Sequence, residues 1–259
     1  MIDLQQPLEA PTQRQLERFD ADGYLVIPRL ASPGRLAQLN QVVAQQLVES
    51  IEPAEYEADL RYPGAPAERD APGGGTTRRL LQAYARDALL RQCAEDPTVL
   101  RTLHMLLGNE LRLSQVHHNC IMTKQPSYSS STGWHQDIRY WAFERGELIS
   151  AWLALGPEFP DNGCLSFLPG THRMEIANER FDDAKFLRTD LPENQKLIAT
   201  RVTPALQAGD VVLFHCRTFH AAGNNRTDRA KWSIVFTYHA LNDRPIPGTR
   251  SASLPSIAV

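Results

Sequence analysis

The spacing of hydrophobic residues divides the chain into a helical first part and a strand-rich second part. Between residues 11 and 110, apolar positions recur at helical spacing in TQRQLERFDADG, SPGRLAQLNQVVAQQLVESI and RRLLQAYARDALLRQCAEDPTVLRTLHMLLG. The first of these ends at a glycine, and the second begins at a Ser-Pro cap. Between them, the apolar run GYLVIPRL indicates a short strand. These patterns predict a mostly helical N-terminal flank.

From residue 111 to 245 the pattern changes to short runs rich in β-branched and aromatic residues. Gly, Pro, Asn and Asp separate the runs, which are ELRLSQVHHNCIMTK, ELISAWLALG, GCLSFLPG, KLIATRVTPA, GDVVLFH and KWSIVFTYHAL. Many short strands with frequent turn signals are typical of a mainly β barrel or sandwich. Residues 246–259 follow as a C-terminal tail.

One segment of the helical flank shows neither the helical nor the strand spacing of apolar residues. Residues 52–77 read EPAEYEADLRYPGAPAERDAPGGGTT and combine proline, glycine and charge. We expect a mobile loop here. Its length suggests a lid over a functional site, and a disordered surface insert is the alternative.

Composition and charge exclude several classes of protein. The 259-residue chain has a formal net charge of −3, and it has no Lys/Arg-rich run that would indicate nucleic acid or an anionic membrane as a partner. The polar N-terminus has no apolar signal core, and no run of transmembrane length follows. Its four cysteines lack CxxC spacing, which favours reduced thiols in a cytoplasmic protein. The oligomeric state is not readable from these features.

The stretch GWHQDIRYW, residues 133–141, contains the first candidate metal ligands. On a strand, His135 and Asp137 share one face because side chains alternate with period two. A histidine from another strand, with His215 and His220 as the candidates, would complete a set of two imidazoles and one carboxylate. Such a set suits non-haem Fe(II) and leaves positions open for substrate groups and O₂. The alternative is a solvent-facing pair on a half-buried strand.

Four segments in order resemble the phytanoyl-CoA dioxygenase family of Fe(II)/2-oxoglutarate-dependent oxygenases. They are FDADGYLVIPRL, WHQDIRYW, DNGCLSFLPGTHR and GDVVLFHCRTFHAAGNNRTDR, and together they span most of the chain. The resemblance implies a single domain over residues 1–259. It also implies a double-stranded β-helix, a jelly-roll barrel similar to that of cupins, with flanking N-terminal helices.

By position, the resemblance identifies His135, Asp137 and His220 as the catalytic metal ligands. It implies Fe(II) as the metal, with 2-oxoglutarate and O₂ as cosubstrates and succinate and CO₂ as products. Related halogenases lack the carboxylate ligand, so Asp137 favours hydroxylation. The implied substrate is a small-molecule metabolite.

The resemblance also suggests residues that bind 2-oxoglutarate. The family usually places an arginine eleven residues after the distal histidine, where this chain has Lys231. Arg229 is the alternative anchor, two residues earlier on the same face of an extended strand. Trp152, Gln136 and Cys120 correspond to positions near the cosubstrate.

Several residues are candidate substrate contacts. Arg139 shares strand parity with His135 and Asp137, so it is expected to point towards the pocket. Weaker candidates are Trp141, although such a tryptophan more often serves barrel packing, and Arg217 at the barrel mouth. Arg78 and Arg79, which follow the glycine-rich segment, would reach cosubstrate or substrate if that loop folds over the site. Two other functions stay open: a metal-binding family member without 2-oxoglutarate turnover, and a cupin-like binding or isomerase protein that uses another divalent metal.

Overall fold

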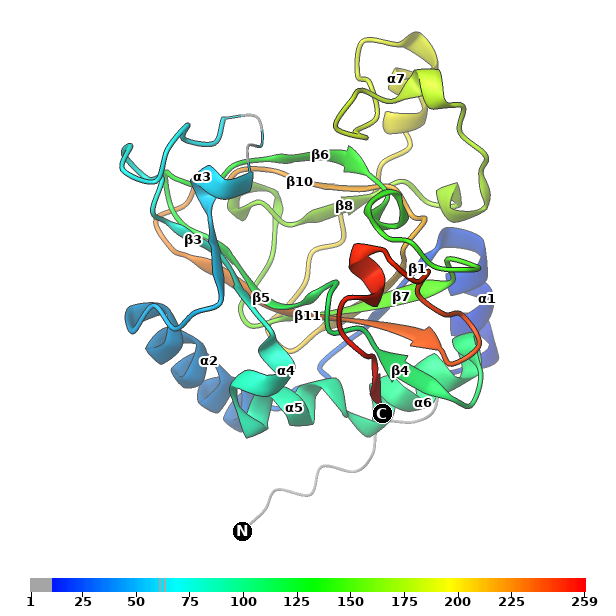
Figure 1. The fold of residues 1–259 in the computed structure, drawn as a ribbon, viewed down its shortest axis with the longest axis horizontal. Coiled ribbons are helices and arrows are strands. Elements are labelled where there is room, and N and C mark those ends of the chain that lie inside the picture. The colour runs from blue at the N-terminus through cyan, green and yellow to red at the C-terminus, as the bar shows by residue number, and fades with distance from the viewer. Residues whose placement is uncertain (1–10, 61, 63) are drawn as a thin grey trace.

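Two β-sheets face each other and form the centre of the molecule (Figure 1). The computed structural model describes residues 11–60, 62 and 64–259. Within these residues the larger sheet runs in the order β1-β9-β7-β11-β5-β3-β2, with β4 paired to β11 and β12 paired to β4. The smaller sheet has the order β6-β10-β8. The neighbouring strands pair antiparallel, as expected for a jelly-roll barrel.

The strands are short, and β11 is the longest of those described. The strands of the larger sheet are β1 (Tyr24–Ile27), β2 (Ala54–Tyr56), β3 (Thr77–Leu81), β4 (Leu111–Leu113), β5 (Asn119–Lys124), β7 (Leu148–Ala154), β9 (Val211–His215), β11 (Lys231–Ala240) and β12 (Ile257–Ala258). Those of the smaller sheet are β6 (Thr132–His135), β8 (Leu165–Phe167) and β10 (His220–Ala222).

Helices cover the outer face of the larger sheet, below it in Figure 1. The described helices are α1 (Gln13–Asp22), α2 (Pro33–Val48), α3 (Glu57–Leu60), α4 (Ala83–Arg86), α5 (Ala88–Ala94), α6 (Pro97–Leu107) and α7 (Pro192–Ile198). Helix α2 begins where the Ser32 hydroxyl accepts a hydrogen bond from the backbone N–H of Arg35. Its apolar face buries Leu39 and Val43 in one cluster with residues of β7, β9 and β11. This burial fixes the outer face of the sheet that supports the site.

A second core lies between the two sheets. Phe167 from β8 is fully buried and packs with Trp152 of β7, Phe214 of β9 and Val235 of β11 in one cluster. The predicted mainly β jelly-roll with flanking helices is thus confirmed. One end of this inner core leads to the candidate metal ligands on β6 and β10.

Two segments differ from the sequence prediction. Residues 78–81 were expected to be helical but form most of β3 (Thr77–Leu81), in which alternate side chains are buried. The segment KLIATRVTPA was expected to be a strand, but its first residues complete α7. Pro192 occupies the first turn of α7, and Leu197 and Ile198 cover a small cluster with Phe181 and Leu187. The contacts of α7 with this small cluster therefore decide the structure of the segment.

The predicted loop 52–77 contains regular structure at its start. Residues 54–56 form β2 and residues 57–60 form α3, so a loop over the whole segment is wrong. The carboxylate of Glu57 is buried and accepts hydrogen bonds from the side chain and backbone of Ser130. The start of this segment is therefore attached to the barrel by a buried polar contact.

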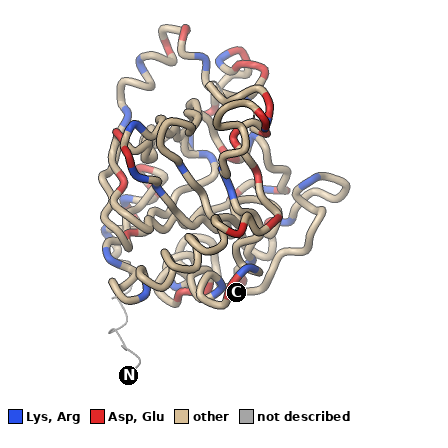
Figure 2. The backbone as a smooth tube through the Cα atoms, turned by 90° about the vertical axis from the view of Figure 1, so that its left-hand side faces the viewer, with Lys and Arg blue, Asp and Glu red and all other residues tan. Residues whose placement is uncertain are grey.

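Charged residues of both signs are distributed along the chain (Figure 2). Among the described residues, no helix is both long and apolar enough to span a bilayer.

Candidate metal centre and adjoining cavities

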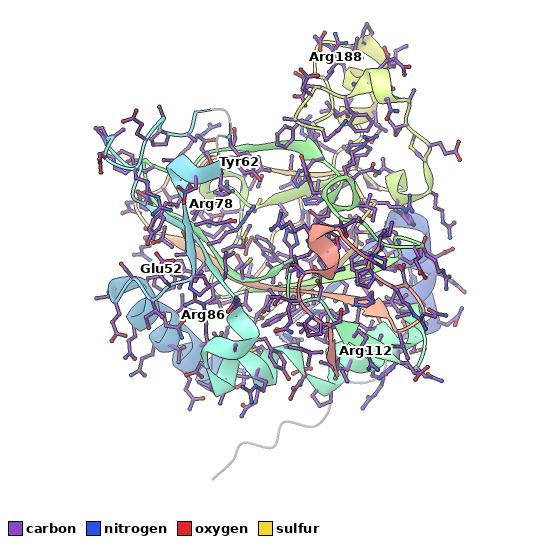
Figure 3. The ribbon with its side chains drawn as sticks, in the orientation of Figure 1. Glu52, Tyr62, Arg78, Arg86, Arg112 and Arg188 are labelled. Carbon is purple, nitrogen blue, oxygen red and sulfur yellow. The ribbon has the colours of Figure 1, made fainter. Side chains whose placement is uncertain are left out.

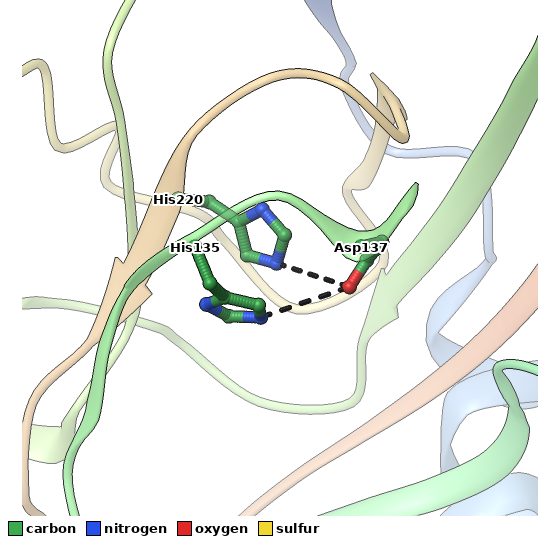
Figure 4. A group of neighbouring side chains, drawn as sticks. All are labelled: His135, Asp137 and His220. Carbon is green, nitrogen blue, oxygen red and sulfur yellow. Dashed lines mark ion pairs between the residues drawn. The ribbon is translucent and has the colours of Figure 1, made fainter. Parts of the chain in front are cut away.

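His135, Asp137 and His220 converge on one point between β6 and β10 (Figure 4). His135 ends β6 and His220 begins β10, and the two residues are direct partners in the antiparallel register. Each imidazole places its Nε2 3.7 Å from Oδ1 of Asp137. All three residues are buried. The three side chains predicted as a metal set are therefore brought together.

The strand ends earlier than predicted, but the predicted relation of His135 and Asp137 holds. Strand β6 ends at His135, and Asp137 begins a 3-10 helix that ends at Tyr140. The backbone of Gln136 between them is still extended, with φ −114° and ψ 129°. His135 and Asp137 therefore share one face, as the alternation of side chains along an extended chain predicts.

Both imidazoles are oriented by backbone carbonyls. Nδ1 of His135 lies 2.9 Å from the carbonyl oxygen of Gly133, and Nδ1 of His220 lies 3.0 Å from that of Thr218. A ring that donates its Nδ1–H to a carbonyl keeps the lone pair of Nε2 free. Both lone pairs then face Asp137. This is the arrangement of metal-binding histidines.

The protonation states also suit a metal. Burial, together with the nearby His135, lowers the pKa of His220 to about 4, so its imidazole is neutral at neutral pH. Burial alone would raise the pKa of Asp137, but His118, His220 and His135 outweigh it and hold that pKa below its usual value. A deprotonated carboxylate and a neutral imidazole are the forms in which Asp137 and His220 bind a divalent cation.

The spacing of the three donors fits one metal ion. Bonds of about 2.0–2.2 Å place donors about 3 Å apart at right angles and about 4.2 Å apart when opposite. The donor atoms here lie within 4.8 Å of one another. Both carboxylate–imidazole distances are 3.7 Å, between the values for right-angle and opposite donors. Two imidazoles and one carboxylate form the donor set that suits Fe(II) with open coordination positions.

A narrow inner cavity extends from the metal ligands into the barrel. It is lined by Lys124, Thr132, Trp152, Leu165, Phe214 and Lys231, together with His135 and His220. Tyr62 and Arg78 lie near each other at its β3 side (Figure 3). The cavity is thus apolar near the ligands and cationic farther in.

Lys231 is positioned by a buried carboxylate that the sequence did not reveal. Its Nζ donates to Glu158 Oε2 at 3.1 Å and to Ser233 Oγ at 3.3 Å. Glu158 also accepts from Trp152 Nε1 at 2.9 Å and from Ser233 Oγ at 2.6 Å. One carboxylate therefore orients both Lys231 and Trp152 on the cavity wall.

The other proposed cosubstrate residues occupy different positions. Arg229 is exposed in the turn before β11 and does not line the cavity, so its assignment as an anchor is wrong. The Gln136 amide donates to the backbone carbonyl of Arg217, so it attaches the 3-10 helix to the segment before His220. Cys120 does not line this inner cavity but a second, wider cavity described below, and burial raises the pKa of its thiol to about 12.

A wider outer cavity of about 630 Å³ adjoins the ligands on the other side. His135 and Asp137 form its floor, and Tyr62, Tyr140, Trp141 and Phe186 supply aromatic walls. Residues near the C-terminus complete the rim with Arg250, Ser253 and Leu254. Cavities of this size hold drug-sized molecules.

The proposed substrate contacts divide into two groups. Arg79 lines both cavities and Trp141 lines the outer one. Arg139 does not reach either: the 3-10 helix turns its guanidinium onto Phe181, 3.1 Å from the ring centroid. Arg217 donates to the backbone carbonyls of Arg145 and Gly146 on another face of the molecule. Arg139 and Arg217 are therefore wrong as pocket residues.

Besides Glu158, sequence reasoning missed four side chains at the site. His118 lines both cavities, with Nδ1 3.5 Å from Asp137 Oδ2. Lys124 lines the inner cavity, and Tyr62 and Phe186 meet edge to face across the outer one, 5.9 Å between centroids. The only sequence signal was for Lys124, a lysine ending an apolar strand.

Comparisons with known proteins agree with this geometry. Residues 19–232 match the family model described as phytanoyl-CoA dioxygenase. The ectoine dioxygenase of Sphingopyxis alaskensis is 26% identical over 253 residues, which cover 91% of this chain and 78% of that protein.

Solved structures show the same fold. The epimerase SnoN, in complex with Fe³⁺, α-ketoglutarate and nogalamycin RO, superposes with a TM-score of 0.75 at 25% identity over 94% of this chain and 90% of its own. EctD from S. alaskensis with 2-oxoglutarate and 5-hydroxyectoine gives a TM-score of 0.72 at 23% identity, covering 95% and 82%. On the family match, its ordered motifs and the converging ligands, this chain belongs to the phytanoyl-CoA dioxygenase family.

Proposed function

We propose that this protein hydroxylates a small molecule bound in the outer cavity, with 2-oxoglutarate bound in the inner one. The enzyme class follows from the family: an Fe(II)- and 2-oxoglutarate-dependent dioxygenase that uses O₂. The observation that carries the proposal is the position of His135, Asp137 and His220 between two cavities of different character. The overall reaction converts R–H, 2-oxoglutarate and O₂ into R–OH, succinate and CO₂.

His135, Asp137 and His220 are the residues that would hold the metal. Bound Fe(II) would supply the redox chemistry that couples O₂ and 2-oxoglutarate decarboxylation to oxidation of a substrate C–H bond. Two imidazoles and one carboxylate would leave coordination positions open for exchangeable ligands. Both histidine rings are already oriented by the carbonyls of Gly133 and Thr218, so ligand geometry does not depend on the substrate.

The inner cavity matches a dicarboxylate with its far end away from the metal. Lys231 supplies the ammonium group by which we propose the far carboxylate is held. Glu158 also pairs with that ammonium, so the far carboxylate of 2-oxoglutarate and the Glu158 carboxylate would share the Lys231 ammonium. Lys124, whose pKa burial lowers to about 6, lines the same end and can take up a proton when an anion arrives. Trp152, Leu165 and Phe214 keep water away from the middle of the cosubstrate.

The outer cavity supports a small organic substrate. Its floor is formed by the metal ligands, and Phe186 packs edge to face on His135, 5.7 Å between centroids. The part of the substrate nearest the metal would therefore lie among aromatic rings. One compared protein is named for the small molecule ectoine, and another was solved in complex with nogalamycin RO. Both support a small-molecule substrate here.

The first test is an anaerobic titration of metal-free protein with Fe(II) and then 2-oxoglutarate. We expect a saturable visible charge-transfer band, because 2-oxoglutarate chelates iron through its C1 carboxylate and keto oxygen. Asp137→Ala should lose the band. His215→Ala is the matched control and should keep it, because His215 pairs with Glu147 outside both cavities. Fe(II) binding without a band in the wild-type protein would instead support a family member without 2-oxoglutarate turnover.

A second test addresses the reaction. Candidate small molecules are incubated aerobically with the loaded protein, and succinate release and product mass are measured. Hydroxylation adds one oxygen to the substrate. A product of unchanged mass with inverted stereochemistry would make the protein an epimerase and would contradict hydroxylation.

A further inference from the structure

The two oxygens of Asp137 have different surroundings. Oδ1 faces Nε2 of both His135 and His220 (Figure 4). Oδ2 is buried and has no hydrogen-bond partner among the described residues. Leaving a buried carboxylate oxygen without a donor is costly. Nδ1 of His118 lies 3.5 Å from Oδ2.

His118 is held in place from several directions. Its Nδ1 lies 3.4 Å from the hydroxyl of Ser150, which in turn lies 2.8 Å from the hydroxyl of Thr237. Its ring meets Trp141 edge to face at a centroid distance of 5.3 Å. Next to it, the side chain of Asn119 accepts a hydrogen bond from the backbone N–H of Tyr84 and fixes the start of β5. The imidazole therefore approaches Asp137 from a supported position.

We propose that His118 is a positioning residue for the metal centre: its single Nδ1–H, which lies between the Ser150 hydroxyl at 3.4 Å and Oδ2 of Asp137 at 3.5 Å, donates to Oδ2 and keeps Oδ1 directed at the metal, while the Ser150 hydroxyl is the competing acceptor. A closer approach of a few tenths of an ångström brings the 3.5 Å contact into hydrogen-bond range. The proposed function enters only in naming the metal as Fe(II).

This contact has a consequence for coordination. An oxygen bound to His118 is not free to turn towards the metal as a second donor. Asp137 then contributes one bond, and the open positions stay available for 2-oxoglutarate and O₂. Partners that hydrogen-bond to metal-binding carboxylates typically contribute about 10- to 100-fold to metal affinity.

The contrasting variants are His118→Leu and His118→Asn. Leucine fills a similar volume without a donor, whereas the asparagine Nδ2 lies the same number of bonds from Cα as the histidine Nδ1. His239→Leu is the matched control. It also removes an imidazole, but one that is buried, contacts Ser256 and lines neither cavity. The probe is Fe(II) alone, titrated anaerobically into each metal-free protein, with urea unfolding of the same samples.

We expect His118→Leu to weaken Fe(II) binding about 10- to 100-fold. His118→Asn should stay within about threefold of wild type, and His239→Leu should bind as wild type does. With 2-oxoglutarate added, the visible band should move or disappear in His118→Leu and return in His118→Asn. A residue that only fills space would not show this rescue.

The proposal is overturned if folded His118→Leu binds Fe(II) as tightly as wild type. It is also overturned if the leucine and asparagine variants weaken binding equally, because volume would then be the cause. Should the leucine variant not fold, His118→Ser, too short to reach Oδ2, replaces it with the same expectations. A wild-type protein that binds Fe(II) without a 2-oxoglutarate band would contradict the proposed function, and the affinity series would still decide the role of His118.

Discussion

Replacing Lys231 by methionine separates the stabilising role of this residue from its proposed role in cosubstrate binding. The side chains of Lys231 and Glu158 are 4% and 0% exposed, so removing the ammonium leaves a fully buried carboxylate without its cation. Breaking a buried ion pair from one side costs about 3–5 kcal/mol. Glu158 keeps its hydrogen bonds from Trp152 and Ser233, which favours the lower end, about 3 kcal/mol. The melting temperature should fall by about 6–12 °C.

The double variant Lys231→Met/Glu158→Gln tests the cause of that loss. It removes both charges and keeps a carbonyl acceptor for the two remaining donors. We expect it to recover more than half of the lost free energy of unfolding in urea denaturation. Its affinity for 2-oxoglutarate should nevertheless stay about 10- to 150-fold below wild type, the equivalent of one lost hydrogen bond to a charged group. The charge-transfer titration measures this affinity.

Two results would refute this reasoning. A loss below about 1 kcal/mol in Lys231→Met would mean that the pair is not desolvated as the structure shows. Recovery of 2-oxoglutarate affinity in the double variant would mean that another cation holds the far carboxylate, and Lys124 would be the first to examine.

Three further predictions concern other parts of the molecule. Asp137→Ala and His220→Ala should abolish Fe(II) binding in an anaerobic titration, while His215→Ala should retain it; the reverse pattern would make His215 the ligand. Because burial lowers the pKa of Lys124 to about 6 from 10.5, the unfolded chain binds more protons between these values, and this residue makes wild-type stability rise with pH across that window. The free energy of unfolding of Lys124→Met, measured in urea, should therefore exceed that of wild type most at pH 6 and by less towards pH 10. A difference that stays constant with pH would contradict the lowered pKa of Lys124. Tyr140→Phe should speed trypsin cleavage after Lys185, because the Tyr140 hydroxyl donates to the carbonyl of Ala184 at 2.8 Å, with unchanged cleavage as the contrary result.

The convergence of the three candidate ligands was predictable because four motifs occur in a fixed order and because the chain stays extended through Gln136. His135 and His220 are partners in the β6–β10 register, and the extended Gln136 places Asp137 on the same face as His135. The 3-10 turn that begins at Asp137 explains the error at Arg139, whose strand parity pointed into the pocket and whose guanidinium instead lies over Phe181.

Other features depend on contacts that no local pattern records. No motif marks His118, and only the folded chain brings its imidazole to Asp137. Phe186 and Tyr62 lie in irregular segments, and only the folded chain places them over the outer cavity. Strand β3 was predicted as helix because RRLL fits both helical and strand spacing of apolar residues. Its pairing with β5 makes the segment a strand. The extent of a single domain over residues 1–259 stays a prediction.

The carbonyl bonds to Nδ1 of His135 and His220 bear on what happens when the metal is removed. In each case the carbonyl belongs to the residue two positions earlier, so each ring is held by its own local backbone. The rings lose little rotational freedom when an ion arrives, and the entropic cost of coordination falls mainly on the ion and its waters. A chelator should therefore leave the imidazole pair nearly unchanged. The same protein could then be reloaded with a redox-inactive divalent ion, so that substrate could be held in the outer cavity without turnover.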